Sequence, residues 1–157
     1  MTAYALPEDF VATYGFQESV EISNLENPTA ENPNLVEIDL AIALASSEID
    51  SILGARYVVP ISPPTPLILA AHALCLARYR LDRYRRRADV VDDYKLAVSQ
   101  LEKMATGKVA LARPDATLVE PAAPSQESAF GDVSYYAPDP IWTRENLTGY
   151  QRIVRRY

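Results

Sequence analysis

Six arginines lie within ten residues in the middle of this 157-residue chain. They are Arg78, Arg80, Arg83, Arg85, Arg86 and Arg87. A guanidinium group makes two parallel hydrogen bonds to a phosphate or to a carboxylate, so the cluster could bind DNA or could form ion pairs. Residues 1–64 contain ten acids and one base, which favours ion pairs with acidic groups of this chain or of a neighbour. We interpret Arg78, Arg80 and Arg85 in this way and keep DNA contact as the alternative.

The single histidine and the single cysteine, His72 and Cys75, lie one helical turn apart in an apolar segment. A catalytic histidine needs a nucleophile or a carboxylate within hydrogen-bond reach, and no spacing in the chain suggests one. One cysteine and one histidine cannot form a structural zinc site on their own, and one cysteine excludes a disulfide within the chain. We interpret His72 as a core or interface residue and Cys75 as a small buried apolar residue.

The other candidate sites have ordinary explanations. Ser46 and Ser47 have no histidine spaced to activate them, and they suit a helix that packs closely on a neighbour. Asp89, Asp92 and Asp93 fall where a helix begins, where carboxylates complement the helix dipole without a metal. Asn146 opens a glycosylation pattern, but no signal peptide is recognised at the N-terminus. There is no Gly-rich phosphate-binding loop, so we expect no enzyme activity, no cofactor and no metal.

Charge is unevenly distributed along the chain, whose formal net charge is −6 and whose pI is about 4.8. Residues 1–64 carry a net charge of −9, whereas residues 65–112 carry +4. An acidic protein is not expected to coat nucleic acid. The segregation indicates either pairing inside the chain or two surfaces that meet different partners. No run of 18 apolar residues is present, and we expect no contact with a membrane.

Periodic apolar residues and helix-ending residues predict four helices. A short helix begins at Pro7 and stops at Gly15, and residues 16–34 are expected to be irregular. A second helix spans about 35–54, because one apolar stripe runs along it at spacings of three and four. Its members are Leu35, Ile38, Ile42, Ala45, Ile49 and Ile52.

The third and fourth helices follow a proline-rich connector at 60–66. The third runs from about Pro66 to Arg86 and is expected to be the central helix, because its first half is apolar on every side. The fourth begins with Asp89 as its N-cap and stops at Gly107. We expect Ile42, Ile49, Leu74 and Leu101 to be buried where these helices meet.

The C-terminal 45 residues differ in character from the rest of the chain. Residues 113–140 are rich in proline and show no sustained period, yet large aromatic residues are spaced along 113–157. Such residues contribute strongly to protein interfaces. We expect an extended arm that binds a neighbouring protein through Tyr135, Tyr136, Trp142 and Tyr150, with Arg144 as a polar clamp. The predicted fold class is therefore all-α, a compact bundle of about four helices at 1–112 with an extended arm at 113–157.

Several stretches, taken in order, carry a resemblance to a known family. They are residues 4–10 with Tyr14-Gly15, then 45–61, 76–81, 94–102, 107–111 and 142–150. Their order and spacing resemble the small head–tail connector proteins of Mu-like tailed phages, also called adaptor or head-completion proteins. The stretch 113–140 matches least.

The resemblance implies a helical structural protein that forms a ring, usually dodecameric, beneath the portal of the capsid. Such a ring extends the DNA channel without specific DNA binding and gives the tail a docking surface. The implied location is the virion neck, reached from the host cytoplasm during assembly, with the portal and tail-proximal proteins as partners. Arg78, Arg80 and Arg85 and the aromatic residues of the arm are then the expected interface residues. The alternatives are a DNA-binding packaging or regulatory module that uses residues 78–87, and a helical adaptor unrelated to phages.

Overall fold

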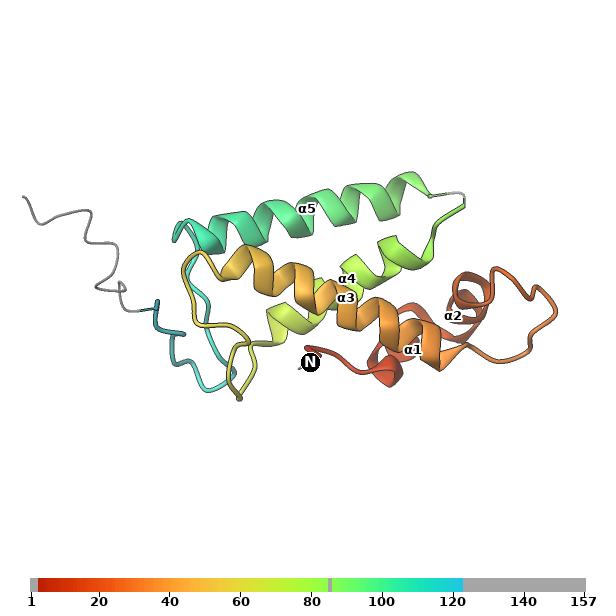
Figure 1. The fold of residues 1–157 in the computed structure, drawn as a ribbon, viewed down its shortest axis with the longest axis horizontal. Helices are drawn as coiled ribbons and strands as arrows, with labels where there is room; N and C mark the ends of the chain where they lie inside the picture. The colour runs from red at the N-terminus through yellow and green to blue at the C-terminus, as the bar shows by residue number, and fades with distance from the viewer. Residues whose placement is uncertain (1–2, 85, 123–157) are drawn as a thin grey trace, which may run out of the picture. The chain divides into compact units, whose positions relative to one another are not determined.

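Five helices form the body of the chain in the computed structural model, which describes residues 3–84 and 86–122 (Figure 1). They are α1 (Pro7–Tyr14), α2 (Phe16–Ser23), α3 (Leu35–Leu53), α4 (Leu67–Leu81) and α5 (Ala88–Ala105). Within these residues the only β pairing is a single bridge between Ala112 and Leu118. The prediction of a compact all-α fold is confirmed.

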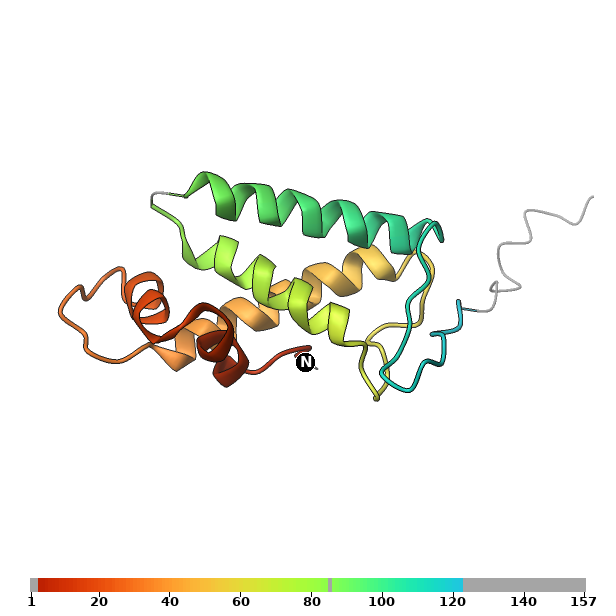
Figure 2. The same cartoon turned by 180° about the vertical axis from the view of Figure 1, so that it is seen from behind.

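The core forms where α4 packs against both α3 and α5 (Figures 1 and 2). The four residues that we expected in it, Ile42, Ile49, Leu74 and Leu101, are all buried. Leu35 is half exposed although it belongs to the predicted stripe, because it is the first residue of α3. The apolar period therefore identified the inner face of α3 correctly from Ile38 onward.

The structure contains one helix more than the sequence indicated. Residues 16–23, which we expected to be irregular, form α2, and Gly15 separates it from α1 with a positive φ of 88°. The buried face of α2 consists of Ser19, Ile22 and Ser23, so it shows almost no apolar period. The serine hydroxyls are satisfied inside the helix, since Ser19 donates to the carbonyl of Gly15 and Ser23 to that of Ser19. Because small polar residues form the buried face, the apolar periodicity that would have predicted this helix is absent.

The predicted helix ends are partly wrong between α4 and α5. α4 ends at Leu81, five residues before the expected Arg86, and α5 begins after Arg87 rather than at an Asp89 cap. The Asp82 carboxylate explains the break, because it accepts the backbone N–H of Arg87 at 3.3 Å and contacts the Arg87 guanidinium at 3.4 Å. Residues 82–84, 86 and 87 are therefore outside both helices, and their side chains do not follow the helical spacing.

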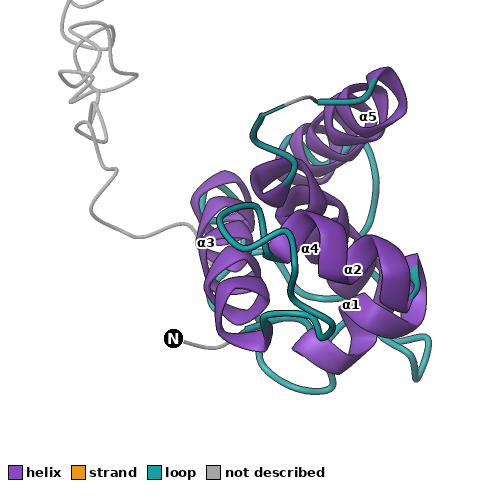
Figure 3. Cartoon of the chain, turned by 90° about the vertical axis from the view of Figure 1, so that its right-hand side faces the viewer, coloured by secondary structure: helices purple, strands orange, loops and turns teal. Residues whose placement is uncertain are grey.

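α1 and α2 lie side by side and pack on α3, and α2 also packs on α4 (Figure 3). The segment before α1 is held by Tyr4, which is buried. Its hydroxyl donates to the carboxylate of Asp50 on α3 and accepts the backbone N–H of Ile61 from the proline-rich connector. Burial raises the Tyr4 pKa above its ordinary value, and the hydrogen bond to Asp50 acts in the same direction.

The residues after α5 return to the helical body. Leu111 and Val119 are both buried, and the Val119 N–H donates to the Leu111 carbonyl at 2.8 Å. The Ala122 N–H donates to the Arg56 carbonyl at 2.7 Å. Val119 and Ala122, which belong to the stretch that we assigned to the arm, thus contact the body in the described structure. The remainder of the expected arm, residues 123–157, lies outside the described residues.

Candidate interaction surface

Arg78 is the most enclosed of the arginines on α4, with a side chain that is 12% exposed. Its Nε lies 2.7 Å from Oε1 of Glu18 on α2, and its other nitrogens approach Asp89 at 3.5 Å and Asp93 at 3.6 Å. Its guanidinium also lies over the ring of Tyr14, 4.8 Å from the ring centre. Arg78 therefore joins α1, α2, α4 and α5. The predicted ion pairing of Arg78 is confirmed, within the chain itself.

Glu18 is shared by two arginines. Nη2 of Arg87 lies 2.7 Å from the same carboxylate oxygen that Arg78 contacts. Burial acts to raise the pKa of the Glu18 carboxyl, but the hydrogen bonds from Arg87 and Arg78 outweigh it, and the pKa lies below its ordinary value. The carboxylate is therefore held in its charged form, and it fixes the loop before α5 against α2.

A second cluster joins α3, α4 and α5. Arg80 contacts Glu48 at 2.6 Å, and the Tyr94 hydroxyl donates to the other oxygen of that carboxylate at 2.9 Å. The ring of Tyr94 stacks on Tyr79, with 4.0 Å between ring centres and 16° between planes. The Arg86 guanidinium lies 4.2 Å from the centre of the Tyr79 ring on the same stack. These residues come together only because α3, α4 and α5 pack against one another.

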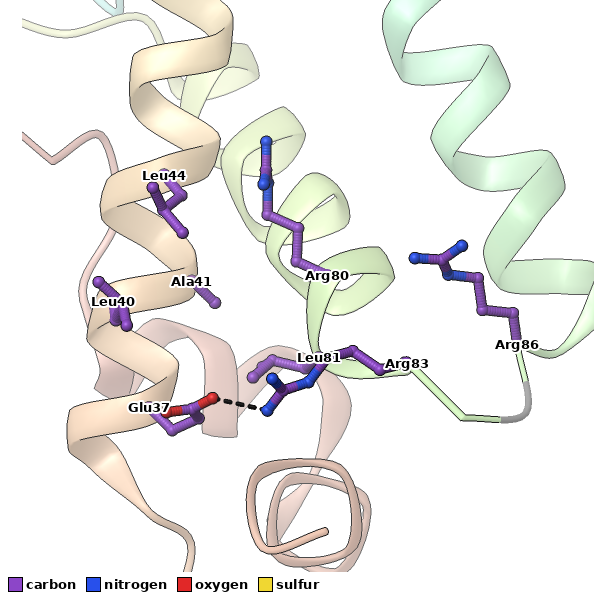
Figure 4. A pocket seen from close by; sticks show the side chains of 8 residues that line it. All are labelled: Glu37, Leu40, Ala41, Leu44, Arg80, Leu81, Arg83 and Arg86. Carbon is purple, nitrogen blue, oxygen red and sulfur yellow. Dashed lines mark hydrogen bonds and ion pairs between the residues drawn. The ribbon is translucent and has the colours of Figure 1, made fainter. Parts of the chain in front are cut away.

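A groove of about 300 Å³ opens between α3 and the C-terminal end of α4 (Figure 4). Leu40 and Leu44 of α3 form its apolar side, and they are 54% and 48% exposed. The opposite side carries Arg80, Arg83 and Arg86. At one end, Arg83 reaches across to Glu37 with a contact of 2.8 Å (Figure 4). We call this feature the α3–α4 groove.

Sequence reasoning missed the apolar side of this groove. Leu40 and Leu44 continue a row that begins at Val36, which is 80% exposed, and residues four apart lie on one helix face. This second stripe on α3 is separate from the core stripe. Its spacing was visible in the sequence, but only the packing shows that no element of the described chain covers it.

The other candidate residues are placed as follows. His72 is buried, burial lowers its pKa, and no hydrogen-bond partner reaches its Nε2 within the described residues. Cys75 is half buried, and burial raises the pKa of its thiol to about 11, which makes it a poor nucleophile. Among the described residues no three His, Cys, Asp or Glu side chains are grouped to hold a metal. No helix there is long and apolar enough to cross a membrane.

The other predicted interface residues lie outside the described residues. Arg85, Tyr135, Tyr136, Trp142, Arg144 and Tyr150 are all in this group. Their assignment to an interface stays a prediction. In the described chain, Arg78 and Arg80 have their own carboxylate partners, and a role for either in contacts between subunits also stays a prediction.

Comparison with known sequences places the chain among the proteins of Mu-like phages. Residues 4–130 match the family described as Bacteriophage Mu, Gp36, and the chain belongs to that family. A relative from Haemophilus influenzae, the Mu-like prophage FluMu protein gp36, is 33% identical over 115 residues. The matched region covers 73% of this chain and 79% of that relative. The predicted relationship to Mu-like phages is confirmed at this level.

Proposed function

We propose that this chain is a non-enzymatic structural component of a Mu-like phage virion, the connector between head and tail. Copies of the chain form a ring beneath the portal, which extends the DNA channel and offers the tail a docking surface. Membership of the Mu Gp36 family supports the phage role. The connector role itself rests on the resemblance to connector proteins in the order and spacing of several sequence stretches. The chain would act at the virion neck after assembly in the host cytoplasm.

The observation that carries this proposal is the pairing of the arginines. Arg78, Arg80, Arg83 and Arg87 each contact a carboxylate of the same chain at 2.6 to 2.8 Å. A DNA-binding module that used residues 78–87 would have to break these pairs to present the guanidinium groups to phosphate. The arrangement favours a structural protein over that alternative. A channel through which DNA must pass should also not bind it tightly, because phosphate contacts dominate DNA affinity.

A nonsense mutation in the gene of a Mu-like phage that encodes this chain tests the proposal directly. We expect lysates that contain separate heads and tails by electron microscopy, and restoration of joined particles when the wild-type chain is supplied in trans. Antibody against the chain should label the neck of intact virions. Mutant lysates with normally joined heads and tails would contradict the connector role.

A gel-shift measurement separates the alternative function. The purified full chain should not retard duplex DNA even at low salt, where phosphate contacts are strongest. Retardation that disappears as salt is raised would instead support a DNA-binding accessory role. The variant Arg86→Ala checks the source of any retardation, since it removes a guanidinium that forms no ion pair in the described chain.

A further inference from the structure

The α3–α4 groove combines an apolar side with excess positive charge. Arg80 and Arg83 are paired with Glu48 and Glu37, whereas Arg86 is exposed and makes no ion pair within the described residues. None of residues 3–34 lines the groove, so the N-terminal part of the same chain leaves it open. A partner suited to this groove would combine apolar side chains with carboxylates.

The N-terminal block, defined as residues 3–34 with α1 and α2, has this complementary chemistry. It contains six acidic residues and no lysine or arginine. Among the described residues, only Glu18 of the six forms an ion pair with a base. Two large apolar side chains are exposed on the block, Leu6 at 60% and Phe16 at 52%. Exposed apolar patches that are rimmed by polar residues mark interaction sites, and a polar rim is typical of protein interfaces.

We propose that the N-terminal block of one copy of this chain docks against the α3–α4 groove of a second copy. Leu6 and Phe16 would add apolar contact against Leu40 and Leu44, and the acidic block would face Arg86. The inference rests on the proposed function, because it specifies the contact by which the ring is built.

The two surfaces come from different parts of the chain, so the contact is head-to-tail rather than two-fold symmetric. Each copy has one groove and one block, and both can be occupied at the same time. Contacts of this kind close into a ring when the rotation per copy allows it. The contact accounts for the charge segregation that remains after the internal ion pairs are formed, with acid on one surface and base on the other.

Two double variants of the full chain test the contact. The groove variant Leu40→Asp/Leu44→Asp and the block variant Leu6→Asp/Phe16→Asp change only exposed side chains, and circular dichroism checks their folding. Each alone should self-associate at least tenfold more weakly than wild type in sedimentation velocity. Mixed at equal concentration, they should form a species of two copies and nothing larger, because one intact groove meets one intact block. Leu96→Asp is the matched control, since Leu96 is 57% exposed on α5, outside both surfaces, and this variant should associate like wild type.

The charge of the groove gives an independent test of the contact, and this test changes a single side chain. Arg86→Glu should weaken association, and raising the salt concentration should weaken the wild-type assembly, because exposed charges are screened. Groove and block variants that associate like wild type, a mixture without the two-copy species, or a wild type that stays monomeric would each overturn the proposed contact. None of these results would alter the phage experiment above, in which head–tail joining is measured on virions. The contact and the connector role can therefore fail separately.

Discussion

Nε of Arg78 lies 2.7 Å from Oε1 of Glu18, and the two residues are sixty positions apart in the chain. This ion pair connects α4 to α2, and Arg87 binds the same carboxylate from the loop before α5. Glu18 therefore links α2 to α4 and to the loop before α5, in addition to the packing of α1 and α2 on α3. Two of the arginines that could contact phosphate, Arg78 and Arg87, are thus paired with a carboxylate of the same chain.

Removing Glu18 should destabilise the protein more than its exposure suggests. Glu18→Ala leaves two guanidinium groups without their shared partner. A hydrogen bond to a charged group contributes about 1.5–3 kcal/mol to stability. We expect a loss of about 2 kcal/mol in the free energy of unfolding measured with urea. Glu21→Ala, an exposed position on the same helix, is the control and should change it by less than about 0.5 kcal/mol. Equal effects at the two positions would contradict the role assigned to Glu18.

The same carboxylate should make stability depend on pH in the acid range. The pKa of Glu18 is lowered in the folded protein, so its contribution is present above the ordinary value of 4.5 and is lost as the pH falls through the folded pKa. The difference in unfolding free energy between wild type and Glu18→Gln should therefore shrink when urea titrations at neutral pH are repeated at about pH 3. A difference that stays constant over this range would show that the carboxylate charge is not the cause.

Leu74 tests the central position of α4. It is buried in the core, and Leu74→Ala should cost about 2–5 kcal/mol because a cavity remains. Leu96→Ala on the exposed side of α5 removes the same atoms without a cavity and should cost less than about 0.5 kcal/mol. Urea unfolding measures both. A loss below about 1 kcal/mol for Leu74→Ala would mean that α4 is not central.

Truncation tests where the folded body ends. A chain that ends at Ala112 loses the burial of Val119 and the hydrogen bonds from Val119 and Ala122, whereas a chain that ends at Ala122 keeps them. We expect the free energy of unfolding of the shorter chain to be lower by about 1.5–3 kcal/mol, which is the value of burying one such side chain. Thermal unfolding followed by circular dichroism compares the two. Equal midpoints would support the predicted end of the body at Ala112.

The longer of these truncations also tests the expected arm. A chain that ends at Ala122 should fold like wild type yet fail to enter virions, because it lacks the aromatic residues Trp142 and Tyr150. The matched full-length variant Trp142→Ala/Tyr150→Ala should show the same defect if those side chains are the anchors. Incorporation is measured by mass spectrometry of purified particles from complemented mutant phage. Normal incorporation of both variants would show that the arm has no role in assembly.

The sequence by itself determined the helices that carry a regular apolar stripe. α3 lies where its spacing predicted and ends at Gly54 as expected, because apolar periodicity and helix-ending glycines are local properties. α5 covers nearly the expected range, although it begins after Arg87 rather than at an Asp89 cap. α2 was missed because its buried face is made of serines around a single isoleucine. The end of α4 was misplaced because Asp82 closes a loop that propensity does not reveal.

Only the tertiary structure decided which acid each arginine meets and which surface stays uncovered. The sequence showed an acidic beginning and a basic middle, and both internal pairing and external contact were consistent with it. The four shortest of these pairs, at 2.6 to 2.8 Å, join residues 32 to 69 positions apart, such as Arg80 with Glu48 and Arg87 with Glu18. Contacts over such separations depend on how the helices cross, and helix crossing follows from packing of the whole core rather than from any local stretch.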